Sequence, residues 1–321
     1  MKKLQKFTEP QITSTYAGEF AGQYIAAALL SARTLDNKLI TIHPNVKYKE
    51  ILQKVAVDGI VQDASCDFVT SGSVVLSERI LQPKELQVNL QLCKQEFVDS
   101  WEALQLGYSA FDSIPANFND FLISYVGGRV AEATEQSIWQ GTNVNGQFLG
   151  FQSAFSASIA AGGATAVLAA KSGSIVISGS ITSANVLDKM NSVVNTIPDT
   201  VYGKEDVLLY VSTNVAKSYQ QALAGGAIGA NGWNNQMNVG EKPFNFNGIE
   251  IVLCPGLSSD KIVAAQKSNL FFGTGLLSDH NEVRVLDMAN LDGSQNYRII
   301  MRYTAGVQFG IGQDIVYYGA Y

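Results

Sequence analysis

Charged residues are scarce in this chain. Asp, Glu, Lys and Arg make up 16% of its 321 residues, whereas about a quarter is usual in globular proteins. Hydrophobic residues make up 46%, while disordered chains combine high charge with few apolar side chains. The composition therefore excludes extended disorder, and so little charge indicates that part of the surface is not left facing water.

An excess of basic residues is also missing. The chain has 22 Lys and Arg against 28 Asp and Glu, for a net charge of −6. Proteins that bind duplex nucleic acid normally carry a basic excess or a basic stripe. The basic cluster Lys2, Lys3 and Lys6 is interpreted as a solvated N-terminal tail. The sequence therefore does not predict tight binding to a nucleic acid.

Cysteines are few and lie far apart. Cys66, Cys93 and Cys254 match no zinc spacing and no disulfide framework. We therefore expect reduced thiols in a protein made in a reducing cytosol. No apolar run follows the charged N-terminus, so no signal peptide is predicted. The sequence also contains no run of about 18 apolar residues, so no membrane span is predicted.

Motifs of catalysis are missing too. His43 and His280 have no Cys, Asp or Glu at dyad or ligand spacing, and no nucleophile elbow, zinc-protease motif or P-loop occurs. The glycine-rich run 224–229 lacks the spacing of a dinucleotide-binding loop. Glu132 and Glu135 are interpreted as solvated charge on a helix face. We expect a structural protein that is not an enzyme, with no catalytic residues, cofactor or metal.

The hydrophobic pattern predicts a mixed α+β protein of about two compact units. Residues 1–35 predict an arm followed by a helix that Asp36 and Asn37 end. Residues 38–100 predict a long hairpin: 40–42 and 55–57 are strand-like, and 67–77 is typical of a turn. The strict alternation of residues 86–92 predicts a strand with one apolar face. A lone hairpin is marginal in water, so this one needs another surface.

The strongest helix pattern covers residues 117–140. Asn117 is its predicted cap, and Gly127 and Gly128 in its middle favour a bend or a close neighbour. Gly141 ends it. Its predicted apolar stripe comprises Phe118, Leu122, Tyr125, Val126, Val130, Ala133 and Ile138.

Helices and strands alternate in the rest of the chain. Residues 141–182 predict loop with a short helix and a strand at 174–177. Helices are expected at 183–196, with an inner face of Val186, Leu187, Met190, Val193, Val194 and Ile197, and at 212–223. Residues 207–211 predict a strand covered on both faces, and 224–247 a long loop. Further strands are expected at 249–254, 261–265, 283–286 and 297–309.

The order of these elements resembles the major capsid protein of tailed bacteriophages, which has the Hong Kong 97-like fold. The family's N-arm, extended E-loop, long spine helix and A-domain match residues 13–35, 57–92, 117–140 and 178–279. The stretch from NLFFGT at 269–274 to YRIIMRYTAGVQFGIGQDIVYY resembles the family's return strands. The resemblance covers nearly the whole chain.

The resemblance implies a division of the chain into five segments. They are an N-arm at 1–37, an E-loop hairpin with a flanking P-domain strand at 38–100, a P-domain with the spine helix at 101–177, an A-domain at 178–280 and return strands to the P-domain at 281–321.

The resemblance also implies a function. The protein would assemble into hexamers and pentamers of an icosahedral shell that encloses the double-stranded DNA of a tailed phage. Its partners would be copies of itself, portal, scaffold and decoration proteins, and DNA held without sequence specificity, but no membrane. It would assemble in the host bacterial cytoplasm and reside in the virion capsid. The alternatives are an encapsulin-like compartment that encloses a cargo enzyme and an enzyme of unrecognised type.

A shell needs contacts between subunits. The candidates are apolar residues at the hairpin tip, in the N-terminal arm and in the long loop, together with a charged pair in the hairpin. Instead of contacting a neighbouring subunit, the tip residues could pack within their own subunit, and Trp233 could lie in a solvent-exposed loop. The expected contact residues are Tyr16, Phe20, Phe68, Val69, Val74, Val75, Leu76, Glu78, Arg79 and Trp233.

Overall fold

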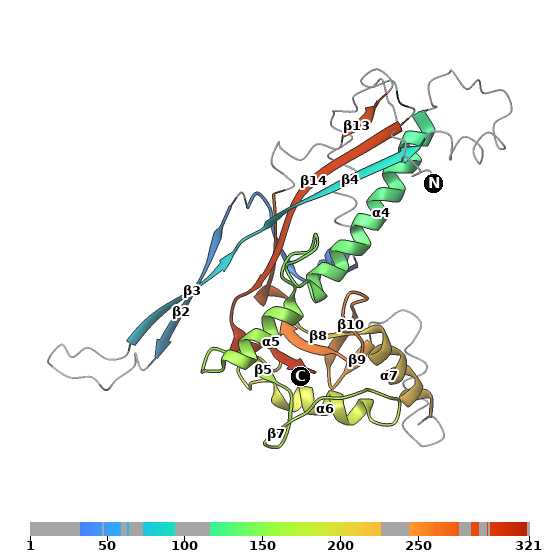
Figure 1. The fold of residues 1–321 in the computed structure, drawn as a ribbon. Helices are drawn as coiled ribbons and strands as arrows, with labels where there is room; N and C mark the ends of the chain where they lie inside the picture. The colour runs from blue at the N-terminus through green and yellow to red at the C-terminus, as the bar shows by residue number, and fades with distance from the viewer. Residues whose placement is uncertain are drawn as a thin grey trace, which may run out of the picture.

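The computed structural model describes residues 33–46, 48–58, 63, 73–93, 116–225, 244–275, 284–288, 294 and 296–319. Two β-sheets with their covering helices form the body, and a two-stranded arm extends from it (Figure 1). The predicted mixture of helices and strands is therefore confirmed.

A five-stranded sheet carries the longest strand of the described chain, β14 (Asn296–Phe309). Along one side it pairs antiparallel with β4 (Lys84–Cys93). Along the other side lie β13 (Arg284–Asp287) and β12 (Leu270–Thr274), and β12 pairs parallel with β1 (Thr41–His43). Alternate residues of β14 from Tyr297 to Ala305 are buried, as the period-two pattern predicted.

Helix α4 (Ala116–Gln140) runs beside β4 and β14 (Figure 1). Val126, Val130 and Ile138 are buried as predicted, in one cluster with the inner face of β14. Ala133, however, is exposed, because the buried stripe turns through Thr134 and Trp139 instead. The helix ends before Gly141, as predicted, but it begins at Ala116, so Asn117 lies inside it and is not its cap.

A six-stranded sheet has the order β5-β15-β11-β8-β10-β9. Its strands are β5 (Leu168–Ala169), β15 (Val316–Tyr318), β11 (Ile262–Gln266), β8 (Val207–Val211), β10 (Ile249–Leu253) and β9 (Phe244–Phe246). All five residues of β8 are buried, as predicted for a strand covered on both faces. The loop predicted over 224–247 is wrong at its end, where β9 pairs with β10; residues 226–243 lie outside the described residues.

Helices α6 (Val186–Thr196) and α7 (Thr213–Gly225) pack in the core of this sheet. The inner face predicted for α6 is confirmed except at Leu187, which is 38% exposed. The short helix expected in 141–182 is α5 (Phe151–Ala161). Small elements complete the body: helix α2 (Arg33–Asp36), strands β6 (Lys171–Ser172) and β7 (Ile175–Val176), and turns η3 (Lys267–Asn269) and η4 (Gly312–Asp314).

Aromatic side chains join the two sheets. The Trp139 ring of α4 lies 5.4 Å from the Tyr210 ring of β8 and 5.5 Å from the Phe151 ring of α5. The Phe155 ring, also on α5, lies 5.4 Å from Phe309 of β14 and 5.8 Å from Tyr317 of β15. These six residues are almost fully buried, so the body has a continuous core beneath both sheets.

The hairpin differs from the prediction in its pairing. Its two arms are β2 (Glu50–Asp58) and β3 (Ser73–Leu81), so residues 73–77 are strand and not turn. The predicted strands at 40–42 and 86–92 fall largely in β1 and β4, which belong to the five-stranded sheet. Gln82 and Pro83 alone separate β3 from β4. Proline has no N–H to continue a ladder, so the chain leaves the hairpin there.

Candidate assembly interface

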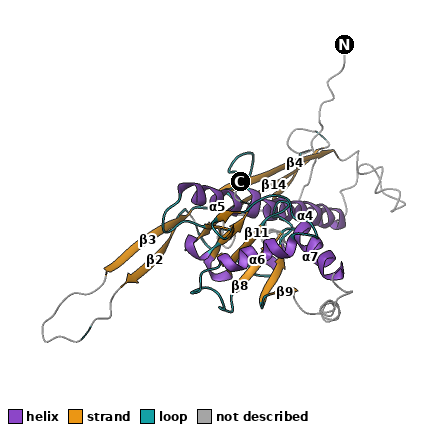
Figure 2. Ribbon diagram, turned by 90° about the horizontal axis from the view of Figure 1, so that it is seen from below, coloured by secondary structure: helices purple, strands orange, loops and turns teal. Residues whose placement is uncertain are grey.

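The β2–β3 arm projects from the body, and both views show it extending past the two sheets (Figures 1 and 2). Within the described residues, β2 and β3 pair only with each other. A two-stranded hairpin is marginally stable by itself, because it buries too little apolar surface. Among the described elements, the arm is therefore one that needs cover from another molecule.

Strand β3 is fixed to the body at its end. Leu81 is fully buried against Gly273 of β12, where a Cβ atom would come within 3.0 Å of the leucine side chain. The Gln308 amide donates a 2.9 Å hydrogen bond to the Ile80 carbonyl. The Arg79 guanidinium lies 4.0 Å from the centre of the Phe309 ring, and burial lowers its pKa.

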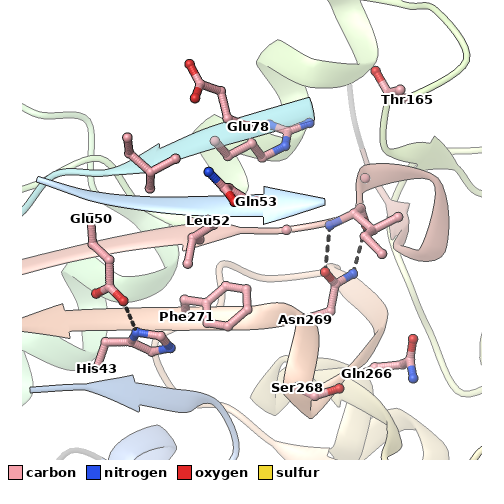
Figure 3. Close-up of a pocket in the computed structure, with 15 residues that line it drawn as sticks. His43, Glu50, Leu52, Gln53, Glu78, Thr165, Gln266, Ser268, Asn269 and Phe271 are labelled. Carbon is pink, nitrogen blue, oxygen red and sulfur yellow. Dashed lines mark hydrogen bonds and ion pairs between the residues drawn. The ribbon is translucent and has the colours of Figure 1, made fainter. Parts of the chain in front are cut away.

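Strand β2 is fixed by a titratable pair. His43 Nδ1 of β1 lies 2.8 Å from Glu50 Oε1 at the start of β2 (Figure 3). The His43 and Phe271 rings also meet almost at right angles, with their centres 5.2 Å apart. The sequence did not suggest this pair, because the turn of the chain between β1 and β2 brings the two residues together.

A groove of about 750 Å³ lies between the arm base and the body (Figure 3). Asn269 shapes one end: its Nδ2 donates to the Ile311 carbonyl at 2.8 Å, and its Oδ1 accepts the Ile311 N–H at 2.7 Å. The lining mixes charged and amide side chains, including Glu50, Gln53 and Glu78. Such a surface is suited to polar contacts with another polypeptide.

A second groove, of about 590 Å³, runs beside helix α4. Small residues of the helix, Gly128 and Ala131, line it together with Glu132, Gln136 and Gly256. Apart from the helix's own adjoining turns, no atom of the described residues lies within 4 Å of the position that a Cβ would take at Gly128. The helix therefore presents an open, shallow surface over its central turns.

A buried network ties the segment before β1 to α4. The Thr34 N–H and hydroxyl donate to the two Glu135 carboxylate oxygens at 2.9 and 2.5 Å, and Trp139 Nε1 donates to the Thr34 hydroxyl oxygen at 3.0 Å. Glu135 is thus buried, and its interpretation as solvated charge was wrong, whereas Glu132 is 71% exposed. Burial next to this network strongly raises the pKa of the Cys254 thiol.

The same segment is bound to the other sheet. The Tyr210 hydroxyl of β8 donates a 2.6 Å hydrogen bond to the Leu39 carbonyl. Burial raises the pKa of the Tyr210 phenol, because the charged form would lose its solvation. Residues 33–40 therefore form a strap, bonded to α4 at one end and to β8 at the other.

The predicted contact residues are only partly described. Tyr16, Phe20, Phe68, Val69 and Trp233 lie outside the described residues. Val74, Val75 and Leu76 occupy consecutive positions in β3. Glu78 is exposed on the same strand, and Arg79 is half-buried on the body. Their role between subunits stays a prediction.

Sequence reasoning missed two residues of the arm. Ile51 and Ile80 lie directly opposite each other in the hairpin and are 53% and 45% exposed. The available signal was the apolar alternation of Ile51, Val55 and Val57, which marks one face of a strand.

Among the described residues, no group of three or more His, Cys, Asp or Glu could hold a metal ion. Of the helices in the described ranges, none is both long and apolar enough to cross a membrane.

No protein-family model matches this chain, and no curated protein matches it. Solved structures do. One is the satellite phage P4 procapsid that includes the size determination protein, with a TM-score of 0.55 and 11% identity over 93% of this chain and 98% of that chain. Another is the capsid of the native GTA particle, with a TM-score of 0.57 and 12% identity over 98% and 95%.

A third is the capsid of cyanophage P-SCSP1u, with a TM-score of 0.51 and 11% identity over 99% of this chain and 92% of that chain. The chain therefore shares its fold with capsid proteins along nearly its whole length. The resemblance to tailed-phage capsid proteins is confirmed at the level of the fold.

Proposed function

We propose that this protein is a major capsid protein and that many copies of it assemble into a closed shell. The observation that carries the proposal is the projecting β2–β3 arm, whose strands pair only with each other among the described residues and whose apolar pair, Ile51 and Ile80, is about half exposed. The shared fold supports it, because structures matching 93% or more of this chain come from particles named as capsids and a procapsid.

The finer form of the proposal is an icosahedral shell of hexamers and pentamers around the double-stranded DNA of a tailed phage. The shell would assemble in the host bacterial cytoplasm with scaffold, portal and decoration proteins. The net charge of −6 suits a container that holds DNA without gripping it, because tight binding requires many Lys and Arg contacts to phosphates.

We propose the following roles for the five segments of the chain. Residues 1–37 form the N-arm, 38–100 the E-loop with a P-domain strand, 101–177 the P-domain with α4 as its spine helix, 178–280 the A-domain and 281–321 the return strands. Four of the six strands in the six-stranded sheet, β8 to β11, come from 178–280, which supports an A-domain unit, and β5 and β15 join it from the flanking segments. Trp233 in its long loop would contact neighbours around the capsomer axis, and Tyr16 and Phe20 would do so from the N-arm.

The arm supplies the contact that closes the ring. Repeated head-to-tail contacts generate a closed ring when each subunit is rotated by a fixed angle against its neighbour. We propose that the arm of one subunit lies across α4 of the next, over the groove at Gly128 and Ala131. Phe68, Val69, Val74 and Leu76 would bury apolar area there.

Polar residues contribute less to this contact. Glu78 would pair across the boundary, whereas Arg79, expected to pair there as well, lies on the Phe309 ring of its own chain. An exposed ion pair contributes only about 0–1 kcal/mol. Burial of apolar area, at about 25 cal/mol per Å², would supply most of the free energy of assembly.

Electron microscopy and sedimentation of the purified protein, with and without a scaffold protein, test the proposal. We expect closed shells or capsomer rings. A variant with residues 51–80 replaced by a short Gly-Ser linker should stay folded by circular dichroism but fail to assemble. A wild-type chain that remains monomeric at high concentration, with scaffold present, would contradict the proposal. Nuclease-resistant DNA inside the shells supports a phage capsid, whereas a co-purified enzyme identifies a cargo compartment.

A further inference from the structure

The register of the arm divides its residues between two faces. Side chains alternate along a strand, and residues directly opposite each other in a pair share a face. Ile51 pairs with Ile80 and Gln53 with Glu78, and the same register carries on to the end of the arm. The face that begins with the isoleucine pair is called the outer face here; it comprises positions 51, 53, 55, 57, 74, 76, 78 and 80.

The outer face is apolar by composition. Six of its eight positions hold Ile, Val or Leu, namely Ile51, Val55, Val57, Val74, Leu76 and Ile80. Ile51 and Ile80 are about half exposed in the free chain. The two isoleucines are thus largely open to solvent, and Ile51 also lines the groove at the arm base.

The opposite face is bound to the chain's own body. Leu81 is fully buried there, and Arg79, two positions along, lies on the Phe309 ring. Glu50, on the same face of β2, is bonded to His43. Farther out, this inner face is mostly polar by sequence, with Lys54, Asp58, Ser73 and Ser77 at its positions.

We propose that the outer face of the arm is the surface that binds a second copy of this chain, and that the inner face is not. The inference rests on the proposed capsid function and adds to it the side of the arm that makes the contact. When an arm has one polar and one apolar face, burial of the apolar face is what lowers the free energy of association. Of the three valines and leucine expected as anchors, the register places Val74 and Leu76 on this surface and Val75 on the inner face.

The size of the outer face fits a contact repeated around a ring. Two strands of nine residues at about 3.3 Å per residue and about 4.8 Å between strands present roughly 300 Å² on one face. A stable pairwise interface buries about 800 Å² on each partner. One arm contact is therefore too small to hold an isolated dimer. In a ring, each copy binds one neighbour with its own arm and is bound by the arm of the other neighbour, so the buried area adds up over all the contacts.

Two neighbouring valines provide a matched test. Val74→Asp and Val75→Asp introduce the same charge at consecutive positions of β3, so they share strand propensity and solubility effects and differ in the face. We expect Val74→Asp to lower the assembled fraction at least tenfold, by sedimentation and negative-stain microscopy. Val75→Asp should stay within about twofold of the wild type.

A second pair of variants controls for folding. Ile80→Asp on the outer face and Ser77→Asp on the inner face should repeat the contrast, and circular dichroism and the melting temperature should match the wild type in all four variants. Normal shells from Val74→Asp and Ile80→Asp, with assembly blocked by Val75→Asp or Ser77→Asp, would overturn the face assignment and leave the capsid function standing. A wild-type chain that never assembles would overturn both.

Discussion

Strand β8 and the β2–β3 arm both carry branched apolar residues but have opposite surroundings. β8 lies inside a six-stranded sheet, with β11 and β10 on its two sides and all five residues buried. β2 and β3 also carry Ile, Val and Leu, yet in the described chain each has one neighbouring strand and Ile51 and Ile80 stay exposed. The comparison teaches that apolar residues in this protein serve two ends: folding in the body and, on our proposal, association in the arm.

The largest expected effect is a loss of stability confined to the body. Leu209→Ala in β8, where the leucine is fully buried, should lower the free energy of unfolding by about 2–5 kcal/mol. Ile80→Ala in the arm should change it by less than about 0.5 kcal/mol, as at exposed positions generally. Urea titration monitored by circular dichroism measures both. Equal losses would mean that the arm is packed within its own chain.

Alkaline pH should lower the free energy of unfolding of the body and should not act directly on the arm. Burial raises the pKa of Tyr317 to about 12 from an ordinary value of 10.0. Below pH 10 the phenol is neutral in both states, so its contribution to stability is complete. Between pH 10 and 12 only the unfolded chain ionises at this residue, and about 2–3 kcal/mol is lost.

Denaturant titrations at pH 9 and pH 11.5 measure this loss. Tyr317→Phe should reduce the difference between the two values, although Tyr210 and Tyr318, whose pKa values burial also raises, retain part of it. An unchanged difference in Tyr317→Phe would contradict the assignment. Neither strand of the arm contains a tyrosine, so this titration acts on the body alone.

The strap, residues 33–40, adds a third case to the comparison of body and arm, because it is held by hydrogen bonds to the buried Glu135 carboxylate. Glu135→Ala removes the acceptor for two Thr34 donors and should lower the free energy of unfolding by about 1.5–3 kcal/mol, as for hydrogen bonds to a charged group. Glu132→Ala, on the same helix but exposed, should stay within about 0.5 kcal/mol. Equal effects in a urea titration would contradict the buried role of Glu135.

The smallest expected effect lies where the arm meets the body. Arg79→Gln removes the guanidinium from the Phe309 ring, an interaction typically contributing about 0.5–1 kcal/mol. Hydrogen exchange of the β3 amides should become several-fold faster, while that of β8 stays unchanged. An equal acceleration in both strands would show that Arg79 supports the whole fold and not the arm.

Elements marked by strong periodicity were predictable from the sequence. Helix α4, the buried strand β8 and the long alternating strand β14 appear close to their expected bounds, because each pattern is local. Pairing was not: the alternation at 86–92 is equally compatible with a hairpin and with a sheet strand. The choice depends on β14, about two hundred residues later in the chain.

The site was predicted less completely for the same reason. Glu135 looks like ordinary helix-face charge until Thr34, 101 residues away, is placed against it. Ile51 and Ile80 form a pair only after β2 and β3 are aligned in register. Sequence patterns indicate which face of an element is apolar, but not which surface, within the chain or on another copy, will cover it.

The two-residue joint at Gln82 and Pro83 has a mechanical consequence. β3 continues through it almost directly into β4, and β4 is hydrogen-bonded to β14 from Lys84 to Cys93. A load applied to the outer end of the arm is therefore passed along a nearly unbroken run of backbone into the longest strand of the body. In a shell under internal pressure, such a connection would make each arm a lever that shares tension between neighbouring subunits.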